Sequence, residues 1–327
     1  MMRSSILDLL RGAGEEYISG EEIANRLGVS RTAVWKHIKE LREAGYEIVS
    51  HSRSGYSLRE APDILLPNEI KNGLHTKCIG QTIVYQESID STNIRAKQLA
   101  AEGAPEGTVV VAEEQGTGRG RLERSFFSPK GKGIWFSVIL RPEFTPQEAP
   151  KCTLLAAVAV AMAMERFGLK AGIKWPNDIL YEGKKLVGIL TEMNAEIDRI
   201  NYVVIGTGIN VNIMPEDFPE DIRTVATSLA IMKGGKLPRV KFFQAVLESM
   251  EELYDIVRQQ GFVPVMQKWK HYTITLGQEV NVIGIGRNES FSGIAADIDE
   301  EGALLVDTEV GRRRVLAGDV SIRPKNK

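Results

Sequence analysis

Three segments between residues 114 and 212 carry the side chains best suited to chemistry. The first, residues 114–124 (EQGTGRGRLER), follows an apolar strand and contains three glycines and three arginines. Glycine lets the backbone approach a ligand closely, and arginine donates to phosphate or carboxylate. The segment matches neither of the common nucleotide patterns, G-x-x-x-x-G-K-[ST] and G-x-G-x-x-G. It therefore predicts a site for an anion, while a flexible turn with solvated arginines is the alternative.

The other two segments lie at the ends of predicted strands. Residues 174–178 (KWPND) begin a hairpin that turns at residues 182–183 and returns as residues 184–190 (KKLVGIL), which include Lys185 and Gly188. Residues 205–212 (IGTGINVN) place small residues and an amide at the end of an apolar strand. Taken singly, a solvated strand edge and a simple turn would explain them.

In this order, and preceded by Ser91-Thr92-Asn93, these segments resemble the biotin protein ligase family, specifically its bifunctional members that also repress the biotin operon. The resemblance covers nearly the whole chain. It implies an ATP-dependent ligase that makes biotinyl-5'-AMP and pyrophosphate from biotin and ATP. A lysine of a biotin carboxyl carrier protein, such as that of acetyl-CoA carboxylase, then attacks the mixed anhydride.

The resemblance also implies roles for matching residues. The catalytic residues would be Lys185, Arg121 and Asp178, the last orienting the incoming amine. Biotin would be bound by Ser91, Thr92, Asn93, Gln115, Arg119, Gly120, Arg121, Lys185 and Gly188. ATP would be bound by Arg119, Arg121, Arg124, Lys174, Asn177, Lys185 and Asn210. Cations suit this chemistry because a carboxylate must attack an anionic phosphate.

Two further expectations concern this site. Mg²⁺ is expected with ATP, whose phosphates supply part of its shell, and no dedicated metal site is expected because the chain offers no cluster of metal ligands. Where the family usually continues its loop as GRGRRGRxW, this chain has Glu123 in place of glycine and Phe126 in place of tryptophan. These departures bear on how the loop closes and retains the adenylate.

The elements around these segments form three predicted domains. Residues 1–62 are typical of a winged helix-turn-helix, with Ser19 and Glu22 as a capping box, Gly28 ending that helix and Ser30 capping the next. An alternating hairpin over residues 46–58 predicts the wing. Basic residues cluster after residue 23, whereas acids precede it. The predicted DNA contacts are Ser30, Arg31, Thr32, Trp35, Lys36, Lys39 and Arg53.

Residues 63–272 mix strands with helices unevenly, which favours an α+β fold, and the resemblance implies a class II synthetase-like ligase domain. Strands are expected at 108–113, 134–140, 173–175, 185–192 and 202–206, and helices at 93–101, 153–167 and 241–259. Residues 273–327 predict a small β-barrel resembling an SH3 fold. Residues 312–314 (RRR) are interpreted as the charged side chains of an edge strand, with contact to a phosphate as the alternative.

Composition limits the alternatives. A net charge of −2 excludes a global attraction to nucleic acid, so DNA contact must be local. The chain has only two cysteines and no signal-peptide pattern, and its apolar run at 154–164 is too short to span a bilayer. These features favour the cytoplasm. Alternatives are a helical interaction module at the N-terminus, a lipoate protein ligase relative, or a sensor without chemistry. Adenylate is expected to order residues 116–128 and 213–228 and to favour a homodimer that reads an operator.

Overall fold

The computed structural model describes residues 2–118, 120–121, 125–284, 290–317 and 320–324, with side chains to residue 317. The chain separates into two compact units, Met1–Ile64 and Leu65–Lys327. Each unit has a hydrophobic core of its own.

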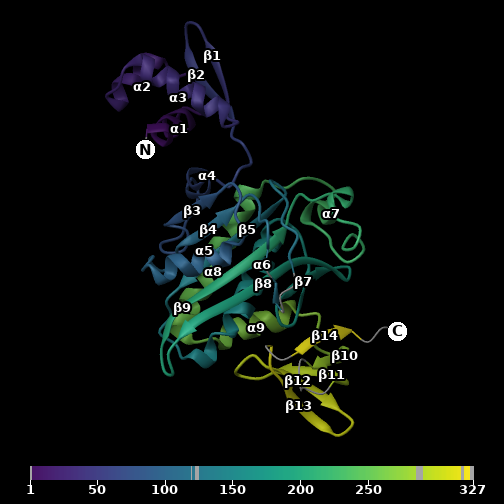
Figure 1. The fold of residues 1–327 in the computed structure, drawn as a ribbon. Helices are drawn as coiled ribbons and strands as arrows, with labels where there is room; N and C mark the ends of the chain where they lie inside the picture. The colour runs from purple at the N-terminus through teal and green to yellow at the C-terminus, as the bar shows by residue number, and fades with distance from the viewer. Residues whose placement is uncertain (1, 119, 122–124, 285–289, 318–319, 325–327) are drawn as a thin grey trace. The chain divides into compact units, whose positions relative to one another are not determined.

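The N-terminal unit consists of three helices and a hairpin (Figure 1). These are α1 (Met2–Gly12), α2 (Gly20–Leu27), α3 (Arg31–Glu43), β1 (Glu47–His51) and β2 (Gly55–Glu60). Ser19 Oγ accepts from the Glu22 amide at 3.0 Å, Gly28 ends α2 at φ 65°, and Ser30 Oγ accepts from the Ala33 amide at 3.2 Å. The predicted helix ends are confirmed, although the Glu22 carboxylate pairs with Arg26.

The apolar face of α3 holds this unit together. Val34, Ile38 and Leu41 are buried against residues of α1 and α2, as their spacing predicts. The antiparallel hairpin pairs Ile48 with Leu58. The opposite face of α3 is exposed and carries polar side chains together with Trp35.

The second unit is built on a seven-stranded sheet of order β3-β4-β5-β9-β8-β7-β6. Only β3 and β4 are parallel, and every other neighbouring pair is antiparallel. The strands are β3 (Ile83–Gln86), β4 (Val109–Ala112), β5 (Gly133–Leu140), β6 (Gly172–Lys174), β7 (Asp178–Tyr181), β8 (Lys184–Ala195) and β9 (Ile200–Asn210). The predicted α+β class is confirmed, and β3 is a strand that the sequence patterns do not single out.

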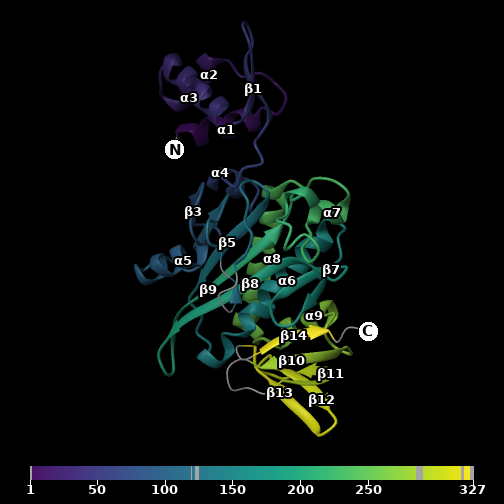
Figure 2. The ribbon, with the colours of Figure 1, turned by 45° about the vertical axis from the view of Figure 1, so that its right-hand side comes forward.

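Helices cover the two faces of this sheet unequally. One face packs on α6 (Lys151–Arg166), α8 (Arg239–Gln260) and α9 (Val263–Tyr272), and the ring of Phe136 lies 4.8 Å from that of Phe243. On the other face Ile139 and Val204 pack against α5 (Thr92–Ala101). Figure 2 shows α5 and α6 on different sides of the long strands β8 and β9. The short helices α4 (Pro67–Lys71) and α7 (Leu229–Lys233) contribute Ile70 and Leu229 to the main core.

A smaller antiparallel sheet of order β13-β12-β11-β10-β14 follows. Its strands are β10 (Glu279–Gly284), β11 (Phe291–Ile298), β12 (Leu304–Thr308), β13 (Gly311–Val315) and β14 (Val320–Pro324), the last not predicted from the sequence. At the edge strand β13, Arg312 pairs with Asp307 at 2.7 Å and Arg314 pairs with Asp299. The predicted charged edge is confirmed, because these arginines are engaged by acids of their own sheet.

The two sheets of this unit are joined at Trp175. Its indole nitrogen donates to the Gly302 carbonyl at 3.1 Å, and its amide donates to Thr275 Oγ1 at 2.8 Å. Over the part of the chain described, no helix combines the length and the apolar character needed to cross a membrane.

Candidate functional site

Strands β8 and β9 form the floor of a cavity of about 320 Å³. Gly188 on β8 pairs with Gly208 on β9, and Gly206 lies two residues away on the same face. A Cβ at position 188 or 208 would stand 2.8 or 2.7 Å from the Phe126 ring, and one at position 206 would stand 1.9 Å from Asn93 Oδ1. Glycine is therefore required at all three positions, because side chains rest directly on the main chain.

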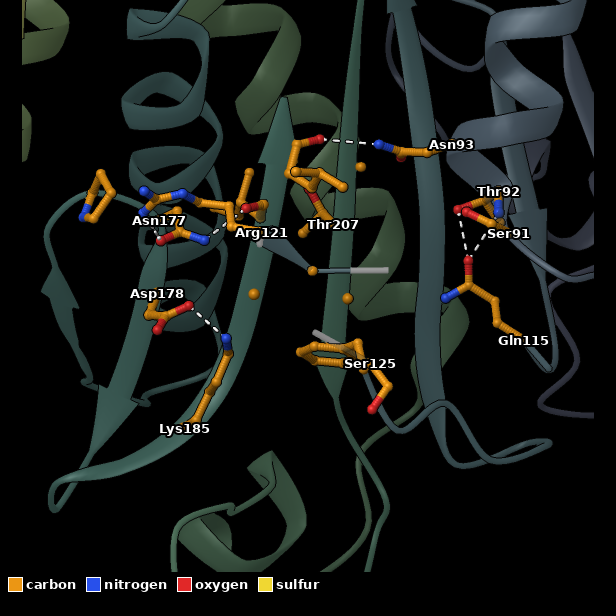
Figure 3. A pocket seen from close by; sticks show the side chains of 18 of the residues that line it. Ser91, Thr92, Asn93, Gln115, Arg121, Ser125, Asn177, Asp178, Lys185 and Thr207 are labelled. Atoms are coloured by element: carbon orange, nitrogen blue, oxygen red, sulfur yellow. Dashed lines mark hydrogen bonds and ion pairs between the residues drawn. The ribbon is translucent and has the colours of Figure 1, made fainter. Parts of the chain in front are cut away.

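One side of the cavity is lined by neutral hydrogen-bonding side chains (Figure 3). Gln115 Oε1 accepts from the Thr92 amide at 2.9 Å and lies 3.1 Å from Thr92 Oγ1. The side-chain amide of Asn93 donates to the Leu190 carbonyl at 3.2 Å and to Glu192 at 2.9 Å. The start of α5 is therefore fixed to β8 and to the residues that follow β4.

The other side carries charge. Lys185 Nζ lies 2.7 Å from Asp178 Oδ1 and 5.6 Å from the centroid of the Phe126 ring. Arg121 donates to Asn177 Oδ1 at 3.3 Å and to the Ala317 carbonyl. With Lys174, the described lining therefore holds three cationic side chains and one carboxylate. This side suits a ligand that carries more than one negative charge.

Phe126 lines the cavity and also packs against the apolar cluster that contains Ile213 and Phe218, in the segment before α7. Its ring lies over Gly188 and Gly208 and meets the ring of Trp135 edge to face at 5.9 Å. Its amide donates to the Gly118 carbonyl at 2.7 Å, which closes the loop that it ends. An aromatic ring thus stands at the position where the family pattern has tryptophan.

Most of the predicted site residues meet in this cavity. Its lining includes Ser91, Thr92, Asn93, Gln115, Gly120, Arg121, Lys174, Asn177, Asp178, Lys185 and Gly188. Arg119 and Arg124, together with Leu122 and Glu123, lie outside the described residues. The assigned roles of all these residues remain predictions.

Asn210 is placed differently. It is buried at the end of β9 and is not among the described residues that line the cavity. Its amide nitrogen donates to the Thr227 carbonyl at 2.9 Å, which ties β9 to the segment that leads into α7. A contact with nucleotide at Asn210 remains a prediction.

Other lining residues were not singled out from the sequence. Gly206, Gly208, Leu190 and Ser125 line the cavity, although the first two lie in the quoted 205–212 pattern. The repeated glycines of that pattern were the available signal. Leu190 gives none, because an apolar residue in a strand is ordinarily part of a core.

The segment between β9 and α7 is anchored by an ion pair. The pKa of Asp217 is lowered because the Met214 amide donates to its carboxylate and Lys132 lies 3.0 Å away. Lys132 immediately precedes β5, so this pair links residues 213–228 to the central sheet. Among the described residues no three His, Cys, Asp or Glu side chains are grouped as they would be around a metal ion.

The predicted DNA-contacting residues are all exposed on the N-terminal unit. Arg31, Thr32, Trp35, Lys36 and Lys39 are exposed on α3, and Arg53 is exposed in the turn between β1 and β2. Trp35 is 57% exposed, whereas tryptophan side chains are mostly buried on average. Ser30 caps the N-terminal end of α3, next to Arg31.

Three family models match the chain. Residues 3–57 match an HTH domain, residues 85–210 the biotin/lipoate A/B protein ligase family, and residues 275–323 the biotin protein ligase C-terminal domain. The N-terminal match favours a DNA-binding module over a general helical interaction module.

Similar proteins cover the chain end to end. A bifunctional ligase/repressor BirA of Bacillus spizizenii is 45% identical over 98% of both chains, and that of Escherichia coli is 30% identical over 96% of both. A solved biotin protein ligase from Aquifex aeolicus, in complex with biotin and ATP, is 30% identical with a TM-score of 0.66. It covers 75% of this chain and all of its own.

Proposed function

The chain belongs to the family of bifunctional biotin ligase/repressors, and we propose on that premise that its glycine-floored cavity makes biotinyl-5'-AMP. It is an ATP-dependent ligase that joins biotin to a protein. The observation that carries the proposed site is its polarity, with neutral hydrogen-bonding groups on one side and three cations on the other. This arrangement suits a ligand with an uncharged head and an anionic tail.

In the first step, a carboxylate oxygen of biotin attacks the α-phosphorus of ATP. The bond from that phosphorus to the bridging oxygen of the β-phosphate breaks, and pyrophosphate leaves. Two anions must approach, so Lys185 and Arg121 would lower their repulsion and stabilise charge on the α-phosphate oxygens. Lys185 is paired with Asp178 in this structure, so we propose that it exchanges that partner for the ligand's anions.

In the second step, the amine of a carrier-protein lysine attacks the acyl carbon of the anhydride. The bond to the phosphate oxygen breaks, AMP leaves, and the nitrogen loses a proton as the amide forms. Asp178 would orient the incoming amine, since its carboxylate lies in the cationic side of the cavity. We assign no residue as the base.

We propose that Mg²⁺ accompanies ATP rather than occupying a protein site. Oxygen ligands from the triphosphate and water are what Mg²⁺ prefers, and the described lining offers a single carboxylate, Asp178. The ion would offset charge on the β- and γ-phosphates when bound. Lys174 and Asn177 would contact the same phosphates from the protein side.

The protein is also a repressor, and we propose that adenylate controls it through a homodimer. One winged helix buries little surface, so operator affinity needs two copies that read two half-sites. Residues 213–228 follow the glycine floor directly, which would let the bound adenylate order them. Equal operator affinity with and without biotinyl-5'-AMP would count against this coupling. We also propose a cytoplasmic location, in keeping with the free thiols of Cys78 and Cys152.

Exchange of labelled pyrophosphate into ATP tests the reaction. Exchange that requires both biotin and Mg²⁺ supports the proposal. Exchange with lipoate instead would make the chain a lipoate ligase relative, and no exchange with either acid would leave a ligand sensor without chemistry.

A further inference from the structure

Ser137 is a fully buried serine on β5 that no sequence pattern assigns to the site. Its hydroxyl oxygen lies 2.6 Å from Asn93 Oδ1 and 2.8 Å from Thr92 Oγ1. Both neighbours belong to the turn that begins α5 and lines the cavity. Ser137 itself is not among the described lining residues, so it can act on the ligand only through them.

The direction of each proton follows from Asn93. Its side-chain nitrogen donates to the Leu190 carbonyl and to Glu192, which uses both amide protons. Its oxygen therefore faces Ser137 and can only accept. The Ser137 hydroxyl has one proton. It donates that proton to Asn93 Oδ1, so toward Thr92 it can only accept.

The Thr92 hydroxyl also has one proton, and two oxygens compete for it: Ser137 Oγ at 2.8 Å and Gln115 Oε1 at 3.1 Å. We assign the proton to Ser137, the nearer oxygen, so that the Thr92 hydroxyl presents lone pairs toward Gln115 Oε1. Gln115 Oε1 already accepts from the Thr92 amide at 2.9 Å, which fixes the oxygen on that side. The pair then consists of two acceptor oxygens without a shared proton, and a ligand N–H between them would satisfy both.

We propose that Ser137 is a positioning residue that sets Thr92 as an acceptor for an N–H group of the ligand's head. This inference rests on the proposed function, in which the neutral side of the cavity holds the head of biotin. Ser137 thereby contributes to recognition of the acid and has no part in the recognition of ATP.

The variant Ser137→Ala tests this in pyrophosphate exchange with the full chain. Without the serine oxygen, the Thr92 proton turns to Gln115 and fills the space that the ligand N–H would use. We expect the KM for biotin to rise about fivefold, as for one lost hydrogen bond, with kcat and the KM for ATP within about twofold. A merely structural role would raise both KM values together, whereas some loss of thermal stability is expected in either case because Asn93 Oδ1 loses its donor.

A double-mutant cycle with Thr92→Val separates the two explanations further. If Ser137 acts through the Thr92 hydroxyl, the double variant has the same KM for biotin as Thr92→Val alone. The reason is that Thr92→Val already removes the hydroxyl that Ser137 orients. Multiplicative effects on the KM for biotin would overturn the inference, since they would mean that Ser137 acts independently of Thr92.

Ser249→Ala is the matched control. Ser249 is a fully buried serine on α8 whose hydroxyl has no hydrogen-bond partner among the described residues. We expect its removal to leave every kinetic constant unchanged. Wild-type protein that shows no biotin-dependent exchange would contradict the proposed function, whereas normal exchange with an unchanged KM in Ser137→Ala would contradict only the role of Ser137.

Discussion

Lys185 Nζ lies 2.7 Å from Asp178 Oδ1, and the two residues come from neighbouring strands, β8 and β7. The turn between these strands contains Glu182 at φ 50° and Gly183 at φ 77°. The hairpin thus carries a cation and a carboxylate into the same cavity wall. Each strand alone would present only one of them.

Replacement of this lysine should abolish most activity. Lys185→Ala removes a cation from the side of the cavity where two anions must meet, and we expect biotin-dependent pyrophosphate exchange to fall by about 10²-fold or more. Its neighbour Lys184 is exposed and does not line the cavity within the described residues. Lys184→Ala should therefore keep wild-type exchange, and equal losses in the two variants would refute a specific role.

The glycine floor predicts a steric effect of a single methyl group. Gly206→Ala would place a Cβ 1.9 Å from Asn93 Oδ1, so Asn93 must move and the start of α5 with it. We expect the KM for biotin to rise at least about tenfold, equivalent to about 1.4 kcal/mol. Gly235→Ala is the control, because a Cβ at that position would meet no heavy atom within 4 Å and its φ lies outside the left-handed region. Isothermal titration with biotin would report the same difference.

The exposed basic residues of α3 should contribute to operator binding alone. If Arg31 and Lys36 each contact a phosphate, as we propose, Arg31→Ala or Lys36→Ala should lower DNA affinity and reduce the slope of log K against log salt by about 0.9. Ligase activity should not change. Lys241→Ala, an exposed charge on α8, serves as the control in fluorescence anisotropy titrations at several salt concentrations. An unaltered salt slope in the α3 variants would place the DNA contact elsewhere.

The pair between Asp217 and Lys132 should make stability depend on pH. The pKa of Asp217 is lowered by the Met214 amide and by Lys132, so its carboxylate stabilises the fold at neutral pH and loses that effect as the pH falls through the lowered pKa. Asp217→Asn should therefore be less stable than wild type in urea at pH 7, and the difference should shrink below about pH 4. Asp221→Asn, an exposed acid in the same segment, should show no such convergence.

The two thiols should differ in reactivity. Complete burial raises the pKa of Cys152 to about 12, so it stays a neutral thiol at any physiological pH and is closed to reagents. In a Cys78→Ala variant, a disulfide reagent should titrate almost no thiol in native protein and one thiol after unfolding. Rapid labelling of native Cys78→Ala would show that α6 opens readily.

Much of the fold follows from local patterns. The Ser19, Gly28 and Ser30 signals place helix ends correctly, because each acts through its own backbone neighbours. The apolar run at 154–164 becomes the buried helix α6. Strand β3 and the path of β14 depend on partners distant in the chain, which a local pattern does not contain.

Site residues could be predicted from the sequence only where their motifs follow one another in the order of a known family. That order brings Lys185, Asp178 and Gln115 into one cavity, as expected. Ser137 gave no signal, since a serine within an apolar strand has no distinguishing context until Asn93 is placed beside it. Arg239 and Glu113 form a buried ion pair at 2.8 Å although they lie 126 residues apart in the sequence. No local sequence pattern indicates this pair.

The three glycines of the cavity floor have a consequence for how selectivity can change over generations. Because Phe126 and Asn93 already occupy the space above Gly188, Gly206 and Gly208, no side chain can be added at these positions without displacing them. Adaptation to a different acid must then come from the surrounding groups, such as Leu190 or Phe126. Substitutions at the three glycines therefore cannot readily change the specificity, whereas substitutions at the surrounding residues can.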